Sequence, residues 1–206
     1  MAKMKLYYSP SSPYARKVRI AALETGLDKK MEMVSVVLTP VAPNADVDKH
    51  NPVGKIPALS VKGMDLFDSP VICEYLDSQH KGRKLFPRKG RDRWMALRQQ
   101  AMADGLLDAA LLARYEGFLR PEDKRWSDWS KGQIKKIDGV LGQLEAEAKA
   151  LKGKPTIGTI SVVCALGYLD FRFSSFDWRA KHPKLAKWFA TAAKTPSVKA
   201  TVPPPA

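Results

Sequence analysis

Short apolar runs in the first eighty residues predict four β-strands. Residues 5–8, 31–38 and 58–61 are rich in Val, Tyr and other strand formers and are bounded by Ser, Pro or Gly. Residues 66–67 follow the turn signal Lys62-Gly63 and form the fourth candidate strand. Because only a tight turn separates the last two runs, they are expected to pair as an antiparallel hairpin.

Helix-like stretches lie between these strands. Pro13 opens a helix that is expected to stop near Gly26, and Ser69-Pro70 opens another. Proline is favourable in a first helical turn because its missing N–H would have no partner there. The Asp68 carboxylate or the Ser69 hydroxyl is expected to cap the second helix. Residues 39–52 carry three prolines and are expected to be a loop or a very short helix.

The second half of the chain has apolar residues at helical spacing. Helices are expected over residues 91–115, 124–151, 159–171 and 183–194. The predicted organisation is therefore an α/β domain over residues 1–80, a basic linker broken by Gly and Pro over 81–90, and an all-helical domain over 91–206.

Composition agrees with a folded chain that does not cross a membrane. Of its 206 residues, 45% are apolar, which is enough for a sizeable core. Only the Pro-rich tail, residues 201–206, has a composition typical of disorder. No apolar run approaches the roughly 18 residues needed to span a bilayer, and the N-terminus lacks the apolar core of a signal peptide. We therefore expect a cytoplasmic protein.

The chain is strongly basic, with a net charge of +14. Such a charge attracts nucleic acid, anionic membrane surfaces or small anions. The basic residues are scattered and no nucleic-acid-binding motif accompanies them, so nucleic acid is not expected as a partner. Cys73 and Cys164 lie in apolar helix-like stretches and are interpreted as buried. Because no Cys or Cys/His spacing fits zinc, no metal is expected.

Three short segments carry residues suited to a charged peptide ligand. Ser9–Ser12 place hydroxyls at the start of the first helix, where unbonded N–H groups stabilise anions. In Asn51–Leu59, the Ile56-Pro57 bond is a candidate cis peptide that would turn the Ile56 backbone toward an extended ligand. Asp68 and Ser69, at the start of the next helix, are suited to the ammonium and carboxylate of an amino-acid head group.

The combination of these segments resembles the cytosolic glutathione transferases, and most of all their bacterial serine-type group. The motifs are Ser-Pro before Arg16-Lys-Val-Arg19, Asn-Pro-Val-Gly-Lys-Ile-Pro-Ala-Leu over 51–59, and Asp68-Ser69 before a helix. The resemblance covers essentially the whole chain and is densest in residues 4–77. It implies a thioredoxin-like N-terminal domain (βαβ-α-ββα), an all-α helical-bundle C-terminal domain, a homodimer, and glutathione as co-substrate without a metal.

The resemblance also implies roles for individual residues. Ser12 would be the catalytic hydroxyl that stabilises the thiolate of glutathione, with Ser9 and Ser11 as rivals for that role. The backbone of Ile56, before a cis Pro57, would pair with the cysteinyl part of glutathione. Since no cysteine lies near Ser12, reductase chemistry through a protein thiol is disfavoured.

The same resemblance implies which residues would bind the two ends of glutathione. Asp68 and Ser69 would hold the γ-glutamyl end, and either His50 or Lys55 would hold the glycine carboxylate. Asp104 resembles an acid that some relatives point across a dimer interface toward the glutathione amine; a solvated or locally paired acid is the alternative.

The second substrate would be a small apolar electrophile that the thiolate attacks. Candidate residues for its pocket, which also fit ordinary core packing, are Met102, Leu106, Leu111, Tyr115 and Phe118.

Two other functions are compatible with the same motifs. One is a non-catalytic interaction or regulatory protein, as in the stringent-response regulators that bind RNA polymerase; the other is a glutathione-dependent isomerase or peroxidase.

One feature departs from the family pattern. Thr159 would cap the helix over 159–171, but Val162 stands where the family has the reciprocal carboxylate. Such a loss costs about 0.5–2 kcal/mol of stability.

Overall fold

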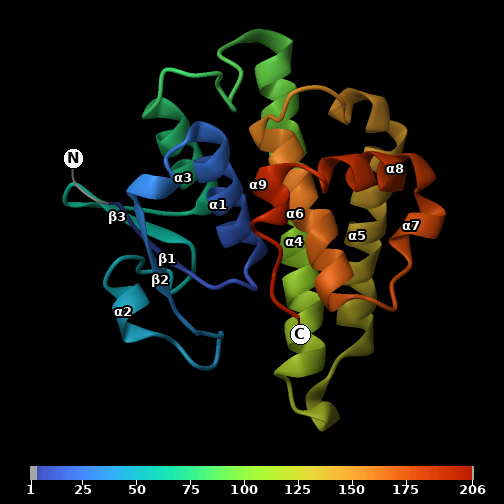
Figure 1. Cartoon of the computed structure of the whole chain (residues 1–206). Helices are drawn as coiled ribbons and strands as arrows, with labels where there is room; N and C mark the ends of the chain where they lie inside the picture. Colours follow the sequence, from blue (N-terminus) through green and yellow to red (C-terminus); the bar gives the residue numbers. More distant parts are fainter. Residues whose placement is uncertain (1–3, 206) are drawn as a thin grey trace. The chain divides into compact units, whose positions relative to one another are not determined.

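The computed structural model describes residues 4–205 and divides the chain into two units (Figure 1). The first unit takes in the chain through Arg93 and again from Pro196, and the second is Trp94–Thr195. The sequence predicts instead that everything after residue 90 belongs to the helical domain. The difference lies in the C-terminal segment, which clusters with the first unit.

A four-stranded sheet forms the centre of the first unit within the described residues. Its strands lie in the order β2-β1-β3-β4, with β1 parallel to β2 and antiparallel to β3, and β3 antiparallel to β4. This topology confirms the predicted parallel unit and hairpin. The strands are β1 (Met4–Tyr8), β2 (Met31–Ser35), β3 (Ala58–Val61) and β4 (Met64–Leu66).

The fourth strand begins earlier than the sequence predicts. Met64 pairs with Val61 directly across the turn, so only Lys62 and Gly63 connect the strands. Both have positive φ, 51° for Lys62 and 75° for Gly63. This is the backbone that two-residue hairpins prefer, because its twist matches that of the strands. Pairing therefore starts at once and ends at Leu66, and Phe67 lies outside the strand.

The helices of the first unit begin and end close to the residues that predicted their boundaries. The helix α1 begins at Pro13, and Gly26 caps its other end with a φ of 69°, a left-handed conformation that favours glycine. It packs against α3 (Figure 1). The helical segments of this unit are α1 (Pro13–Thr25), the 3-10 turn η1 (Asp28–Lys30), α2 (Ala45–Asp48), α3 (Ser69–Ser78) and α9 (Pro196–Lys199).

The C-terminal tail is held against α1, and so the expectation of disorder from residue 201 onward is wrong at its start. Thr201 is buried, and the Arg16 guanidinium donates to the Val198 carbonyl at 3.2 Å and to the Thr201 hydroxyl at 3.4 Å. Arg19 donates to the Ala200 carbonyl at 3.4 Å. The two arginines of the Arg-x-Val-Arg motif thus anchor the end of the chain.

The predicted linker is also packed in the first unit. Leu85 and Phe86 are buried, and their N–H groups donate to the Asp77 carboxylate at 2.7 and 3.2 Å. The Lys84 ammonium donates to the Asp77 and His80 carbonyls. A segment with a polar, basic composition is therefore fixed by one buried acid, which composition alone does not reveal.

The second unit is helical, and α6 is its most buried element. A side-chain carbon on Gly158 would lie 2.6 Å from the Ala96 carbonyl oxygen, so only glycine permits α4 and α6 to approach this closely. Its segments are α4 (Gly90–Phe118), of which residues 90–93 cluster with the first unit, η2 (Glu122–Lys124), α5 (Ser127–Ala146), η3 (Ala148–Leu151), α6 (Ile157–Arg172), α7 (Trp178–Lys181) and α8 (Pro183–Ala192).

The expected loss of a reciprocal cap at the start of α6 is wrong. The helix begins two residues earlier than predicted, and its cap is Thr156, whose hydroxyl accepts from the Thr159 N–H at 3.3 Å. The Thr159 hydroxyl accepts from the Thr156 N–H at 2.9 Å. A second hydroxyl thus replaces the family's carboxylate, and the reciprocal cap is complete.

Two further expectations concern the helices as a group. Among residues 4–205, no helix combines the length and apolarity needed to cross a bilayer. Cys73 and Cys164 are both buried, in α3 and α6, and no disulfide joins them.

Candidate functional site

The strand register brings the three candidate segments to one end of the sheet. Tyr7 in β1 pairs with Ala58 in β3, and Leu59 in β3 pairs with Leu66 in β4. Because each antiparallel partner reverses direction, the end of β1, the start of β3 and the end of β4 lie side by side. The residues that follow β1, precede β3 and follow β4 are the three segments singled out from the sequence.

The first segment is a turn that leads into α1. The Ser12 N–H donates to the Ser9 carbonyl at 3.0 Å, and the Ser12 hydroxyl oxygen accepts from the Ala15 N–H at 3.2 Å. Ser12 is thus the N-cap of α1, and its own O–H remains able to donate to another group. The Ser9 and Ser11 hydroxyls are hydrogen-bonded to each other at 3.0 Å.

The start of α1 offers fewer amides to a ligand than the sequence predicts. Pro13 has no N–H, and the N–H of Ala15 is already bonded to the Ser12 hydroxyl. Two of the first three helical positions therefore supply no donor. The backbone at this helix start therefore offers fewer donors to an anion than expected, and the Ser12 hydroxyl hydrogen is a further donor beside it.

The second segment is shaped by Asn51, which is 2% exposed. Its side chain donates to the Lys55 carbonyl at 2.8 Å and accepts from the Val53 N–H at 3.0 Å. Gly54, with a φ of 64°, donates its N–H to the Asn51 carbonyl at 2.8 Å. The Asn and the Gly of the motif therefore fold the loop that leads into β3.

The predicted cis peptide is present between Ile56 and Pro57. Pro57 is buried and Ile56 is half-buried, directly before β3. Within residues 4–205, no turn or loop hydrogen bond uses the N–H or the C=O of Ile56. Both backbone groups are thus available to a ligand that runs alongside the start of this strand.

The third segment contradicts the capping prediction. Asp68 is the N-cap of α3, yet its carboxylate accepts no capping bond and is exposed. Ser69 is 1% exposed, and its hydroxyl has no hydrogen-bond partner among the described residues. The Phe67–Asp68 peptide bond is also cis. The start of α3 thus carries a carboxylate that makes no capping bond and a buried hydroxyl without a hydrogen-bond partner among the described residues.

The two basic candidates beside this region differ in their availability. The His50 ring bonds the Tyr7 hydroxyl through Nε2 at 2.8 Å and the Asp65 carboxylate through Nδ1 at 2.9 Å. It also stacks on the Tyr7 ring at a centroid distance of 4.5 Å. Both ring nitrogens are therefore occupied. Lys55 is exposed, and its ammonium pairs with no acid among residues 4–205.

The remaining predicted residues lie in α4, within the second unit. Leu106 is fully buried, which agrees with the alternative that it packs in the core. Asp104, Met102 and Tyr115 are half-buried. Leu111 is half-buried as well, whereas Phe118 is 63% exposed.

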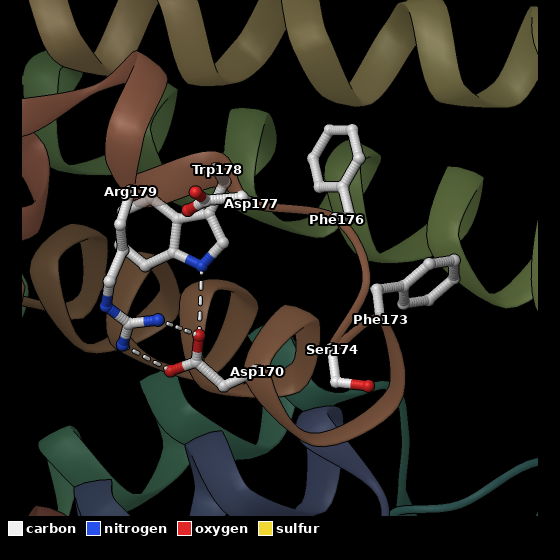
Figure 2. Close-up of a pocket in the computed structure, with 7 residues that line it drawn as sticks. All are labelled: Asp170, Phe173, Ser174, Phe176, Asp177, Trp178 and Arg179. Carbon is white, nitrogen blue, oxygen red and sulfur yellow. Dashed lines mark hydrogen bonds and ion pairs between the residues drawn. The ribbon is translucent and has the colours of Figure 1, made fainter.

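An open pocket of about 430 Å³ in the second unit was not foreseen from the sequence. Figure 2 shows the Asp170 carboxylate turned toward Arg179 and the indole of Trp178. The hydrogen bond to the Asp170 carboxylate raises the pKa of Arg179, as is typical of a stable ion pair. The charges of Asp170 and Arg179 therefore neutralise each other within the pocket. The pocket is lined by Asp170, Phe173, Ser174, Phe176, Asp177, Trp178 and Arg179.

Comparison with known families agrees with this geometry. The model of the glutathione S-transferase N-terminal domain matches residues 11–79, and that of the C-terminal domain matches residues 127–191. The chain is 32% identical to the uncharacterized GST-like protein YibF of Escherichia coli K12, over 98% of this chain and 100% of YibF. The chain belongs to the glutathione S-transferase family.

Solved structures similar to this chain include relatives crystallised with glutathione or a conjugate. A glutathione transferase family member from Pseudomonas fluorescens Pf-5, solved with bound glutathione, is 46% identical with a TM-score of 0.97. The alignment covers 98% of this chain and 100% of that one. A second Pf-5 structure, with bound S-(propanoic acid)-glutathione, has 46% identity, the same coverage and a TM-score of 0.92.

Proposed function

We propose that this protein is a serine-type glutathione transferase that binds glutathione at the end of its sheet and activates the thiol for attack on a small electrophile. The observation that carries the proposal is the start of α3. Ser69 is buried with an unpartnered hydroxyl, and Asp68 beside it has a carboxylate that caps nothing. Leaving a buried polar group without a partner costs about 1–3 kcal/mol, so such a group is a candidate for ligand binding.

The residues at this end of the sheet match the three parts of glutathione. Asp68 would accept from the γ-glutamyl ammonium, and the Ser69 hydroxyl would donate to the γ-glutamyl carboxylate. The backbone of Ile56 would pair with the cysteinyl unit. Lys55 would bind the glycine carboxylate, since both nitrogens of His50 are already bonded.

Ser12 would make the thiolate accessible near neutral pH. A thiol with a pKa of about 8.5 is only about 3% ionised at pH 7, and lowering that pKa by about two units requires about 2.7 kcal/mol. A hydrogen bond to a charged group contributes about 1.5–3 kcal/mol, and a helix N-terminus about 0.3–1 kcal/mol. One donated hydrogen bond therefore supplies most of the effect, and no general base is needed.

For an aryl halide, the activated sulfur would then form a C–S bond with the electrophilic carbon, the halide would leave with the electron pair of the broken carbon–halogen bond, and the thiol proton would pass to solvent. The Pf-5 relative that binds S-(propanoic acid)-glutathione supports a site that accommodates such a conjugate. Met102 and Tyr115, which are half-buried on α4, remain candidates for contact with the second substrate.

Calorimetry and a conjugation assay test the proposal together. Titration with glutathione should show one site per chain, and 1-chloro-2,4-dinitrobenzene with glutathione should yield a conjugate at a rate above the uncatalysed reaction. Absence of glutathione binding would reject the site itself. Binding without conjugation of any aryl halide would replace the transferase with a glutathione-binding protein of another function.

We further propose that the protein is a cytosolic homodimer, as the family resemblance implies. Asp104 would then reach glutathione held by the other subunit. Size-exclusion chromatography with light scattering should give twice the chain mass of 22.9 kDa. A monomeric mass would remove this role for Asp104.

A further inference from the structure

Four hydrogen-bond donors gather at the ends of two helices in the second unit. Arg114 and Tyr115 lie near the end of α4, and Tyr168 and Arg172 near the end of α6. The close contact at Gly158 holds the two helices together, and both run from top to bottom in Figure 1, so their C-terminal ends lie on the same side of the unit.

Between residues 4 and 205, the contacts found for the two arginines are with aromatic rings rather than with an acid, and neither tyrosine hydroxyl is among the fully buried atoms that lack a partner. Tyr168 is 6% exposed, so its phenol group is mostly withdrawn from water. Burial raises the pKa of Tyr168 to about 12, and burial likewise raises the pKa of Tyr115. Both hydroxyls therefore keep their protons near neutral pH and remain donors.

The two arginines influence each other without a neutralising acid. Burial, followed by the positive charge of Arg114, lowers the pKa of Arg172 from its ordinary value, and no carboxylate opposes this. The acid within the same turn of α6, Asp170, is paired with Arg179 instead (Figure 2). By contrast, Arg98 in the first half of α4 bonds the Glu147 carboxylate at 2.8 Å.

Aromatic rings lie beneath both guanidinium groups. Arg114 lies over the Phe118 ring at 4.8 Å, and Arg172 lies over the Phe171 ring at 3.7 Å from the ring centre. Such stacking restrains a guanidinium plane while leaving its N–H edge able to donate. Two restrained guanidinium groups and two phenols thus form a donor-rich cluster in which no carboxylate acts on Tyr168 or Arg172.

We propose that Arg114, Tyr115, Tyr168 and Arg172 bind the carboxylate of a small organic acid, and that this acid is the electrophilic second substrate. The identification as second substrate rests on the proposed transferase function. Guanidinium groups and phenol hydroxyls are suited to a carboxylate, which accepts several hydrogen bonds at once. For an aryl chloride, the glutathione sulfur forms the new C–S bond, chloride leaves with its electron pair, and the thiol proton passes to solvent.

Binding without glutathione tests the anion site independently of catalysis. The probe is 4-chloro-3-nitrobenzoate, and its methyl ester is the neutral control. We expect calorimetry to show at least about ten-fold tighter binding of the acid than of the ester, and at least about ten-fold loss of acid binding in the double variant Arg114→Gln/Arg172→Gln. Arg98→Gln, which removes the same charge from the same helix, should bind the acid as the wild type does.

Conjugation then links the site to the reaction. The double variant should raise KM for the acid at least about ten-fold and leave the KM of the ester within about two-fold. If the wild type conjugates 1-chloro-2,4-dinitrobenzene but not the acid, the assignment of the acid as second substrate is overturned while the transferase proposal stands. If it conjugates neither compound, the transferase proposal fails, and calorimetry still decides the anion site. Equal acid binding by the wild type and the double variant overturns the site.

Circular dichroism should show that the double variant keeps its fold, because removing two mutually repelling charges breaks no ion pair. If it does not fold, Tyr168→Phe decides the matter. That variant removes one hydroxyl and keeps the ring, and acid binding equal to that of the wild type would overturn the site.

Discussion

The starts of α3 and α6 use similar residues in opposite ways. At α6, Thr156 and Thr159 bond each other's backbone N–H groups and complete a reciprocal cap. At α3, Asp68 caps nothing and the Ser69 hydroxyl is buried without a partner in the described chain. Polar residues at one helix start therefore serve the fold, whereas those at the other have no such structural use, and this is why we propose that they bind a ligand.

The start of α1 lies between these two cases. The Ser12 hydroxyl oxygen caps the helix by accepting from the Ala15 N–H, while its hydrogen remains available. A capping hydroxyl is held in one position by its backbone bond. Ser12 can therefore stabilise the fold and orient a donor at the same time, and substitution should separate the three helix starts experimentally.

The largest effect is expected at Asp68. Replacement by Asn removes the charge that would face the γ-glutamyl ammonium, and the affinity for glutathione should fall about 10- to 100-fold. The free energy of unfolding should hardly change, because the carboxylate caps nothing. Calorimetry and urea denaturation measure the two quantities. Asp46→Asn, in an exposed pair with Lys49, removes the same charge and should leave affinity intact.

Ser12→Ala should affect both rate and stability. We expect about a ten-fold lower kcat for conjugation, because the thiolate loses its donor, and glutathione affinity within about two-fold of the wild type. Loss of the cap should also cost about 1 kcal/mol of unfolding free energy. Full activity in this variant, or the same rate loss in Ser11→Ala or Ser9→Ala instead, would move the catalytic role to another hydroxyl.

Thr156→Val should affect stability alone. The change removes the capping hydroxyl of α6 at nearly constant volume and should lower the unfolding free energy by about 0.5–2 kcal/mol, as measured by urea denaturation. Glutathione affinity should be unchanged. Thr191→Val, at an exposed hydroxyl in α8, is the control and should be close to neutral. A Thr156 variant as stable as this control would contradict a structural role for the cap.

No loss of stability is expected for Ser69→Ala. Since the buried hydroxyl has no partner to lose and is costly to leave unsatisfied, its removal should raise the unfolding free energy by about 1 kcal/mol. Retention on a glutathione matrix should nevertheless weaken. A loss of more than about 1 kcal/mol would show that the hydroxyl supports the fold, and the contrast between α3 and α6 would no longer hold.

Local sequence signals predicted much of the fold and the three segments that meet at one end of the sheet. Pro13 and Gly26 mark the ends of α1 because each has a backbone preference that needs no distant partner. The hairpin at Lys62 and Gly63 and the cis bond before Pro57 are local in the same sense. Where local signals compete, as at Thr156 and Thr159, the sequence placed the cap on the wrong hydroxyl.

By itself, then, the sequence determined the order of strands and helices and the three segments that meet at one end of the sheet. The tertiary structure alone decided which polar groups are satisfied. It occupied both nitrogens of His50, buried Leu106, and joined Arg16 to Thr201 across 185 residues. Backbone preferences act over a few residues, whereas the partner of a side chain is set by packing between segments far apart in the chain.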